Sequence, residues 1–324
     1  MAVQSGEFLS YSAKGIREDL TNLIHIVAQQ QTPFLEAIGA GVATSTKHEW
    51  QTDALAAPAD TKKLEGDTLS LDSITATTRL FNYTQINFRT FAVSVTEQIV
   101  KKAGRQNEME YQQAFKFGKE IYRDMERTLA GTNKGYNAGN STTARETAPI
   151  LAWIKTNVSK ASDGSNPTGD GSNGRTDGTV RTLTESLVNT VMQSCYQSGA
   201  MPNLLLASPF NVLNIQKFTN NTTKMTMMSN ADELGGVFKV FETPFGSLTI
   251  KPDFCMRSAA NSDTVSELLI LDTNFWKKCF LHDFMVLDVA RTADSETPRQ
   301  LRIEFALEAS NEASSGIVAD LAVS

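Results

Sequence analysis

Residues 44–96 read TSTKHEWQTDALAAPADTKKLEGDTLSLDSITATTRLFNYTQINFRTFAVSVT, a long and mostly polar stretch with the residue types of extended chain. It has too few apolar side chains to bury a core of its own, and a segment without such a core cannot offset the conformational entropy lost on folding. A polypeptide arm of this kind lies on a neighbouring subunit. The stretch therefore favours an assembly protein over a catalyst.

Two strands are predicted within this stretch, a short one at Lys47–Gln51 and a long one at Leu80–Val95. In the long strand the even-numbered residues 80–88 share one face, but after Arg89 the apolar positions are odd-numbered, at 91, 93 and 95. A change of phase indicates a bulge or a change of environment. We interpret Arg89 as the point where an exposed arm re-enters a packed domain.

An amphipathic helix is predicted directly after the stretch, at Asn107–Leu129. From Ala114 onward, apolar residues recur along it at steps of three or four, which places them on one side. Glycines at 104 and 131 lie just beyond its ends. A helix of about six turns is long for a globular protein, so we expect it to span one domain. The apolar residues are Met109, Ala114, Phe117, Ile121, Met125 and Leu129.

The remaining chain is expected to be an N-terminal arm, a glycine-rich loop and an alternating α/β region. The arm, residues 1–41, contains a helix at Ile16–Val27 that ends before Pro33. Ser159–Gly178 is rich in Gly, Asn, Asp and Ser, which predicts an exposed loop anchored at neither end.

Beyond this loop the pattern switches between helical and strand periodicity. Helices are predicted at Thr182–Gln197 and Pro209–Phe218, and strands at Leu204–Ala207, Val237–Thr243, Ser247–Cys255, Leu268–Leu271, Phe284–Val289, Leu301–Leu307 and Ile317–Val323. The apolar runs at 268–271 and 284–289 indicate strands covered on both faces. The last strand is expected to pair beside Leu301–Leu307.

Composition excludes several classes of protein. The chain has 324 residues, enough for about two domains, and a net charge of −6. This acidic balance argues against tight nucleic-acid binding, which requires a basic face. Three widely spaced cysteines indicate reduced thiols in a protein made in the cytoplasm. The sequence shows neither a signal peptide nor an apolar run of membrane-spanning length.

No constellation of catalytic, cofactor-binding or metal-binding residues is apparent. His48-Glu49 begins like a zinc-protease motif, but Thr52 stands where the second histidine is required. Cys279 and His282 are close in sequence, yet that spacing is weak evidence for a nucleophile and its base. Asp163, Asp170 and Asp177 do not fit an EF-hand loop, and turn chemistry explains them better than a loose cation site. We therefore expect a non-enzyme.

The order of these parts resembles the major capsid proteins of tailed bacteriophages, which share the Hong Kong 97-like fold. The resemblance covers nearly the whole chain. It is strongest at Thr32-Pro33-Phe34-Leu35, at the segment 46–55 that contains His48-Glu49-Trp50, and at Thr176–Thr179 and Leu183–Glu185 after the glycine-rich stretch. The implied fold class is α+β.

The resemblance implies a role for each part. Residues 1–41 would be the N-terminal arm, and residues 42–98 the extended β loop with its base strands. Residues 99–145 would form a peripheral domain around the long spine helix, residues 146–285 an axial α/β domain, and residues 286–324 the strands that return to the peripheral domain. The protein would then form hexamers and pentamers of an icosahedral shell.

The shell would enclose double-stranded DNA without binding it specifically and would be part of the virion. The implied partners are a portal, a separate scaffolding protein and, in some relatives, a decoration protein. Some relatives crosslink Lys to Asn between subunits, but nothing near Lys62 and Lys63 supplies the buried acid that this reaction needs. The side chains that we expect at contacts between subunits, or anchoring the arm by local packing, are Trp50, Lys62, Lys63, Phe81, Tyr83 and Phe88.

Three alternatives stay open at the level of sequence. One is the shell protein of a cellular nanocompartment of encapsulin type, with the same fold. Another is a soluble α/β hydrolase or ligand-binding enzyme, which should form a small oligomer with a concave polar pocket. The last is a tail or other structural virion protein, which should form tubes or rings.

Overall fold

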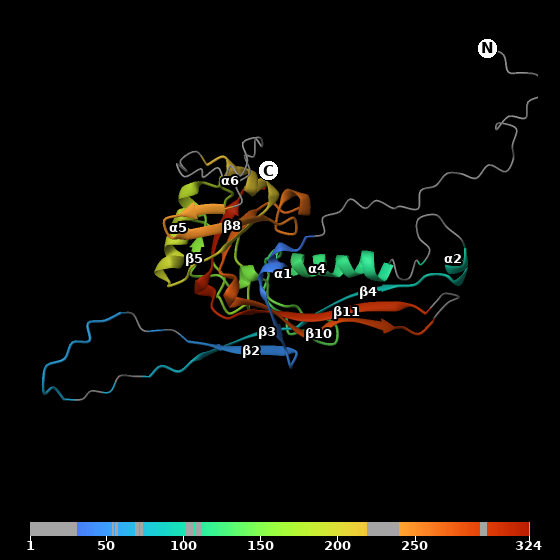
Figure 1. The fold of residues 1–324 in the computed structure, drawn as a ribbon, viewed down its shortest axis with the longest axis horizontal. Helices are drawn as coiled ribbons and strands as arrows, with labels where there is room; N and C mark the ends of the chain where they lie inside the picture. The colour runs from blue at the N-terminus through green and yellow to red at the C-terminus, as the bar shows by residue number, and fades with distance from the viewer. Residues whose placement is uncertain are drawn as a thin grey trace, which may run out of the picture.

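The computed structural model describes residues 31–53, 55, 58–68, 71, 74–100, 107, 112–218, 240–291 and 297–323. The expected helix at Ile16–Val27 and the first residues of the helix predicted at 107–129 lie outside these ranges. Two sheets and a projecting two-stranded ribbon make up the fold (Figure 1). The predicted mixture of helices and sheets is confirmed.

The first sheet is long and four-stranded and is covered on one face by helix α4. Its strand order is β1 (Gly39–Val42), β10 (Trp276–Asp288), β11 (Arg299–Ala309) and β4 (Gln85–Phe91). Helix α4 (Gly118–Ala130) runs along this sheet (Figure 1). It buries Ile121, Met125 and Leu129 completely, which confirms the predicted apolar side of the helix.

Helix α4 is preceded by a wider π-helical segment at Gln112–Phe117, and the chain ahead of it carries the short helix α2 (Val95–Ile99). Helix α4 ends at Ala130, one residue beyond the predicted Leu129, and Gly131 is its C-cap. A further short helix, α1 (Pro33–Ala37), begins with proline in its first turn and packs against α4.

The second sheet is six-stranded and carries helices α5 (Glu185–Gln197) and α6 (Pro209–Gln216). Its strand order is β5 (Asn157–Ser159), β12 (Gly316–Leu321), β9 (Ser266–Leu271), β6 (Leu204–Ala207), β8 (Gly246–Pro252) and β7 (Val240–Thr243). One face of this sheet packs under α5. The other face joins the core of the first sheet around Trp153 and Trp276, so the two sheets share one hydrophobic core.

Strand β12 corrects the predicted partner of the C-terminal strand. Ile317 and Val318 pair with Leu269 and Leu268 of β9, and β12 also lies parallel to β5. Strand β11 belongs to the other sheet, so 286–324 contributes to both sheets rather than returning to one. The apolar pattern of the sequence predicted which strands are buried. It contains no signal that tells which of several buried strands lies next to β12.

The long strand predicted at Leu80–Val95 is two strands, β3 (Thr78–Tyr83) and β4, that join at Thr84. Asn82 and Thr84 are buried, whereas from Gln85 onward the odd-numbered side chains point inward and Ile86 and Phe88 are exposed. The change of phase therefore occurs at Thr84 and not at Arg89. At this junction Thr84 Oγ1 donates a buried hydrogen bond to Glu304 (2.8 Å), and the chain passes from its pairing with β2 to its pairing with β11.

Residues 284–289 were predicted to be covered on both faces, and this was wrong within the subunit. Residues 284–288 form the far end of β10 and Val289 follows it, and Val286, Leu287 and Val289 are each more than a third exposed. An apolar run indicates burial but not whether the covering atoms belong to the same chain.

The glycine-rich loop was predicted to be unanchored, and this was also wrong. Arg175 and Asp320 form an ion pair of 3.0 Å with side chains 2% and 0% exposed. Asp320 also accepts the backbone N–H groups of Ala161 (2.8 Å) and Gly178 (3.0 Å), which ties both ends of the loop to β12. Gly171, at φ +79°, passes so close to Trp153 that an added Cβ would lie 2.7 Å from the indole ring. Polar anchoring therefore replaces the apolar core that the composition lacks.

Candidate functional site

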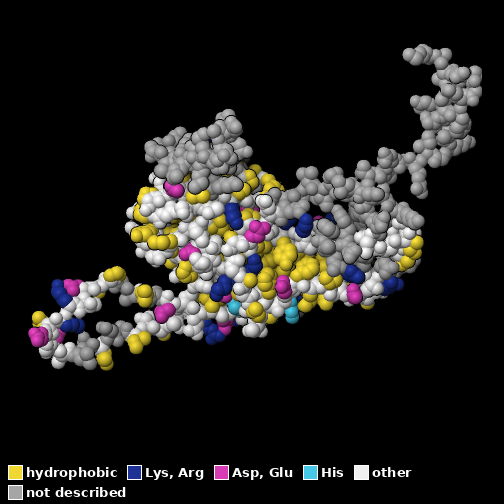
Figure 2. Space-filling model, in the orientation of Figure 1, with side chains coloured by type: hydrophobic (Ala, Val, Ile, Leu, Met, Phe, Trp, Pro, Cys, Tyr) yellow, Lys and Arg dark blue, Asp and Glu magenta, His cyan; other side chains and the backbone are white. Residues whose placement is uncertain are grey.

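The most prominent candidate site is the loop between β2 (Lys47–Thr52) and β3, which projects away from the body of the subunit (Figure 1). Its apolar side chains find no cover in the described chain: Leu55 is 100% exposed, Ile74 98% and Leu71 91%. Figure 2 shows hydrophobic side chains, in yellow, scattered along a loop that stands clear of the rest. We call residues 53–77 the extended loop. Such exposure of large apolar residues indicates a contact with another molecule.

The β2–β3 ribbon at the base of this loop is fixed firmly to the long sheet. The amide of Asn82 donates to the carbonyls of Leu307 (2.8 Å) and Ala148 (3.3 Å) and accepts from the N–H of Ala148 (2.9 Å). Trp50 donates from Nε1 to the carbonyl of Ala309 (2.9 Å) and packs on Trp153. Because buried polar groups are costly to leave unpaired, this base is rigid relative to the sheet.

The six residues expected at contacts fall into three environments. Trp50 packs within its own subunit, as just described, and Phe81 and Tyr83 contact each other and Tyr136 at ring-centroid distances of 5.1–5.8 Å. This is the arrangement expected of residues that anchor the arm by local packing.

Lys62, Lys63 and Phe88 point to solvent. Lys62 and Lys63 lie on the extended loop, where Lys62 pairs with Asp60 at 2.6 Å. Phe88 is 58% exposed and lies on the face of β4 away from α4. The structure thus separates the six residues into three whose rings pack within the subunit and three whose side chains are exposed.

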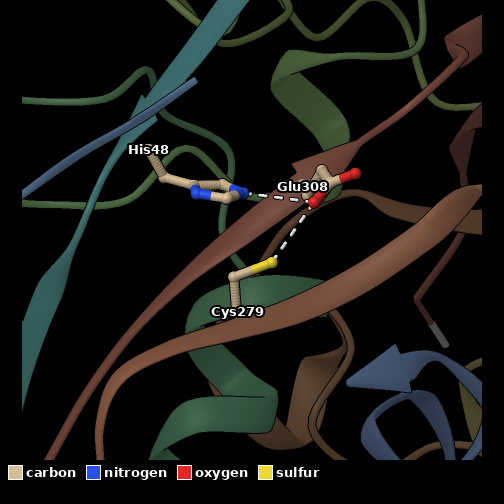
Figure 3. Close-up of side chains that lie close together, drawn as sticks. All are labelled: His48, Cys279 and Glu308. Atoms are coloured by element: carbon tan, nitrogen blue, oxygen red, sulfur yellow. Dashed lines mark hydrogen bonds and ion pairs between the residues drawn. The ribbon is translucent and has the colours of Figure 1, made fainter. Parts of the chain in front are cut away.

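A second constellation lies where β2 crosses the long sheet, and the sequence did not reveal it. His48 Nε2 is 3.1 Å from Glu308 Oε2, and Cys279 Sγ donates to the same oxygen at 3.3 Å (Figure 3). His48 and Glu308 are separated by 260 positions, so no local motif could reveal the cluster. The hydrogen bond from His48 is the main cause that lowers the pKa of Glu308 to about 2, and burial raises the pKa of Cys279 to about 12.

The dyad suggested by Cys279 and His282 is not formed. The Cys279 thiol points to Glu308, whereas His282 is exposed on the far side of a register shift in β10. Among the described residues all three cysteines are buried. No described helix has both the length and the apolar character needed to cross a membrane.

The aspartates of the glycine-rich loop face separate partners. Asp163 accepts from the N–H and hydroxyl of Thr179, Asp170 from Ser172 and Thr168, and Asp177 pairs with Arg257. Their carboxylates serve as turn and ion-pair acceptors, which agrees with the interpretation favoured from sequence.

The comparisons with known proteins agree with this architecture. A solved capsid of a native GTA particle covers 97% of this chain and 98% of its own, with a TM-score of 0.62 at 14% identity. The structure from Mycobacterium phage Ogopogo covers 97% and 99%, with a TM-score of 0.59 at 12% identity, and that from Gordonia phage Cozz covers 99% and 98%, with a TM-score of 0.58 at 9% identity. The fold is therefore that of phage capsid subunits, the Hong Kong 97-like fold.

Sequence comparison narrows this class to a family. The model of the SU10 major capsid protein matches residues 4–322, and the chain belongs to this family. The major capsid protein of Escherichia phage Phieco32 is 35% identical over 123 residues, which are 38% of this chain and 35% of that relative. This match thus spans about a third of the relative's length. The family is one of structural capsid proteins rather than enzymes, which confirms the expectation of a non-enzyme.

Proposed function

We propose that this protein assembles, through its extended loop, into the icosahedral head shell that encloses the double-stranded DNA of a tailed phage. The observation that carries the proposal is the extended loop with its fully exposed leucine and isoleucine side chains. In a closed shell each loop lies over an adjacent subunit, which covers these side chains. Many such contacts act together, so each can be weak while the shell is stable.

The division of the subunit supports this assignment. The long sheet with α4 corresponds to the peripheral domain, and the six-stranded sheet with α5 and α6 to most of the axial domain, which would meet its copies around five- and six-fold axes. The N-terminal arm, residues 1–41, would reach across neighbours. Rings of identical subunits close through such heterologous contacts.

Exposed apolar residues on the long sheet offer a second contact surface. We define the outer-face patch as Ile86, Phe88 and Leu287. The register pairs Phe88 with Arg302 and Arg302 with Met285, so Phe88 and Met285 lie on the same face of the sheet. Leu287 is two residues beyond Met285 and Ile86 two residues before Phe88, so both share this face. Ile86 is 37%, Phe88 58% and Leu287 39% exposed. An apolar patch of this kind is typical of a protein contact.

The proposal implies further partners and a location. A portal and a separate scaffolding protein would direct the assembly of subunits made in the host cytoplasm, and a decoration protein is an optional addition to the finished shell. The net charge of −6 fits a shell that does not trap the DNA it contains.

The test is to shorten the extended loop and observe assembly. Replacing residues 56–76 by a short Gly-Ser linker keeps every residue pair of the β2–β3 ribbon, from Lys47–Tyr83 to Thr52–Thr78. We expect the native chain to form closed shells or five- and six-membered rings by gel filtration and electron microscopy. The shortened chain should keep its melting temperature but form no closed shells.

A matched pair of variants separates the apolar side chains from loop length. Changing Leu55, Leu64, Leu71 and Ile74 together to Ser should also prevent closure, whereas Thr61→Ser with Thr68→Ser should leave assembly unchanged. Normal shells from the shortened chain would refute the role of the loop. A native chain that remains a monomer or dimer, even with scaffold added, would refute the shell itself.

A further inference from the structure

Three potential metal ligands meet where the ribbon crosses the long sheet. Among the described residues, His48, Cys279 and Glu308 are the set of three whose ligand atoms lie within 4.8 Å of one another. They come from three different strands, β2, β10 and β11, and their side chains converge on one point (Figure 3). We propose that these three residues bind a zinc ion that fastens the base of the extended loop to the sheet.

The spacing of the ligand atoms suits a tetrahedral ion. Zinc lies about 2.0–2.3 Å from nitrogen, oxygen and sulfur ligands, so two ligands of one tetrahedron are roughly 3.3–3.8 Å apart. Glu308 Oε2 is 3.1 Å from His48 Nε2 and 3.3 Å from Cys279 Sγ. The third pair, His48 Nε2 and Cys279 Sγ, lies within 4.8 Å, so the three ligand atoms surround one point at which an ion can bind. Water would complete the fourth position.

Neighbouring groups orient Glu308 so that one oxygen is left for the ion. Oε1 accepts from the ammonium of Lys277 (3.1 Å) and from the hydroxyl of Ser310 (2.9 Å). Oε2 therefore faces His48 and Cys279. Outer partners of this kind fix the orientation of a ligating carboxylate.

The chemistry of the set selects zinc over hard cations. One thiol, one imidazole and one carboxylate form a mixed sulfur, nitrogen and oxygen set, whereas Mg²⁺ and Ca²⁺ prefer oxygen alone. On binding, the S–H bond of Cys279 breaks, a zinc–sulfur bond forms and the proton leaves to solvent. The thiolate and carboxylate together then balance the two charges of the ion.

An ion can reach the cluster from solvent. His48 borders an open hollow of about 680 Å³, together with Thr44, Lys47 and Arg79. Gly41 approaches the cluster closely, since a Cβ there would lie 2.7 Å from Cys279 Sγ. Cys279 and Glu308 are buried, so His48 is the ligand through which the cluster borders this hollow.

Cobalt substitution of the metal-stripped full chain tests this proposal. We expect one equivalent of Co²⁺ per chain, a sulfur-to-cobalt charge-transfer band in the near ultraviolet, and loss of that band on adding Zn²⁺. Cys279→Ser should abolish the band and weaken zinc binding at least about tenfold. Cys255→Ser, at a buried thiol elsewhere in the core, is the matched control and should bind as the native chain does.

A second measurement guards against variants that fold poorly. Zinc should raise the melting temperature of the native chain and of Cys255→Ser, but not of Cys279→Ser or of His48→Asn, a change at a partly exposed position. Metal binding without a thiolate band would overturn the proposal. Equal zinc affinity of the native chain and Cys279→Ser would do the same, as would a native chain that takes up no metal.

Discussion

The carboxyl groups of Glu126 and Asp253 are buried beneath helix α1, close enough for the charge of Asp253 to raise the pKa of Glu126. Glu126 also accepts the backbone N–H groups of Phe34 (2.7 Å) and Leu35 (2.9 Å) at the start of that helix. Asp253 Oδ2 is buried and meets no donor group among the described residues. A proton held between the two carboxyls satisfies that oxygen and removes the repulsion between two buried charges.

This pair should make folding stability depend on pH. Burial and then the neighbouring carboxylate raise the pKa of Glu126 from 4.5 to about 8, and burial raises that of Asp253 from 3.8 to about 6. The folded state therefore holds protons that the unfolded state has lost. The stabilising contribution is fully present below about pH 4, falls as the pH rises and is lost above about pH 8.

Asp253→Asn should reduce this dependence, because an amide donates to Glu126 without adding charge. Denaturant unfolding between pH 5 and pH 9, with a separate baseline at each pH, measures how the free energy of unfolding changes with pH. We expect the variant to be more stable than the native chain at pH 9, by an amount on the order of 1–3 kcal/mol. Glu120→Gln is the control. Glu120 is partly exposed and lies on helix α4, which also carries Glu126, and its replacement should keep the native dependence of stability on pH. Parallel stability curves for Asp253→Asn and the native chain would exclude the shared proton.

Asp320 should be essential for the glycine-rich loop. Asp320→Ala removes the closer acidic partner of the buried Arg175 guanidinium, which keeps only the longer pair with Asp177 (3.6 Å), and leaves two backbone N–H groups without an acceptor. The expected loss is about 3–5 kcal/mol in the free energy of unfolding, measured by denaturant titration. Asp60→Ala, which breaks the exposed pair with Lys62, is the control and should leave stability unchanged. A loss no greater than that of the control would mean that the loop is held by other contacts.

Replacement by alanine should lower stability at one of two glycines of strand β1 and have little effect at the other. A Cβ on Gly41 would lie 2.7 Å from Cys279 Sγ, whereas on Gly39 the nearest atom, Lys277 Cγ, is 3.4 Å away and flexible. Gly41→Ala should therefore cost about 1–3 kcal/mol and Gly39→Ala little. Thermal unfolding of both variants measures the difference, and equal melting temperatures would contradict the close approach of β1 to the thiol.

Phe88 should matter for assembly and not for folding. Phe88→Ser removes an exposed ring, so the free energy of unfolding should change by less than about 0.5 kcal/mol while the yield of closed shells falls. Phe88→Leu, which keeps an apolar side chain in the outer-face patch, should assemble as the native chain does. Counting particles by electron microscopy at matched concentration gives the readout. A native yield from Phe88→Ser would remove this residue from the contact.

Buried Phe91 provides a comparison on the same strand. It lies on the α4 side of β4 and stacks on Phe117 at a centroid distance of 5.2 Å. Phe91→Ser should lower stability by about 3 kcal/mol or more. The two phenylalanines therefore test whether the even-numbered side chains of β4 face outward and the odd-numbered ones face the core, as the change of phase at Thr84 requires.

The sequence by itself determined the elements whose signals are local. Periodic apolar residues located α4 and its end at Gly131, and short apolar runs between turn residues located β6 and β9. The polar character of residues 53–77 indicated an arm without a core, because burial requires apolar area that a chain segment either contains or lacks.

Only the tertiary structure decided the features that depend on distant partners. The partner of β12, the anchoring of the glycine-rich loop through Asp320, and the meeting of His48 with Cys279 and Glu308 each join residues far apart in the chain. A hydrophobic pattern specifies that a side chain is buried, but strand order and buried ion pairs follow from which surfaces come together. For the same reason the apolar end of β10 was wrongly predicted to be buried on both faces. An apolar run does not distinguish burial by the same chain from burial by another chain.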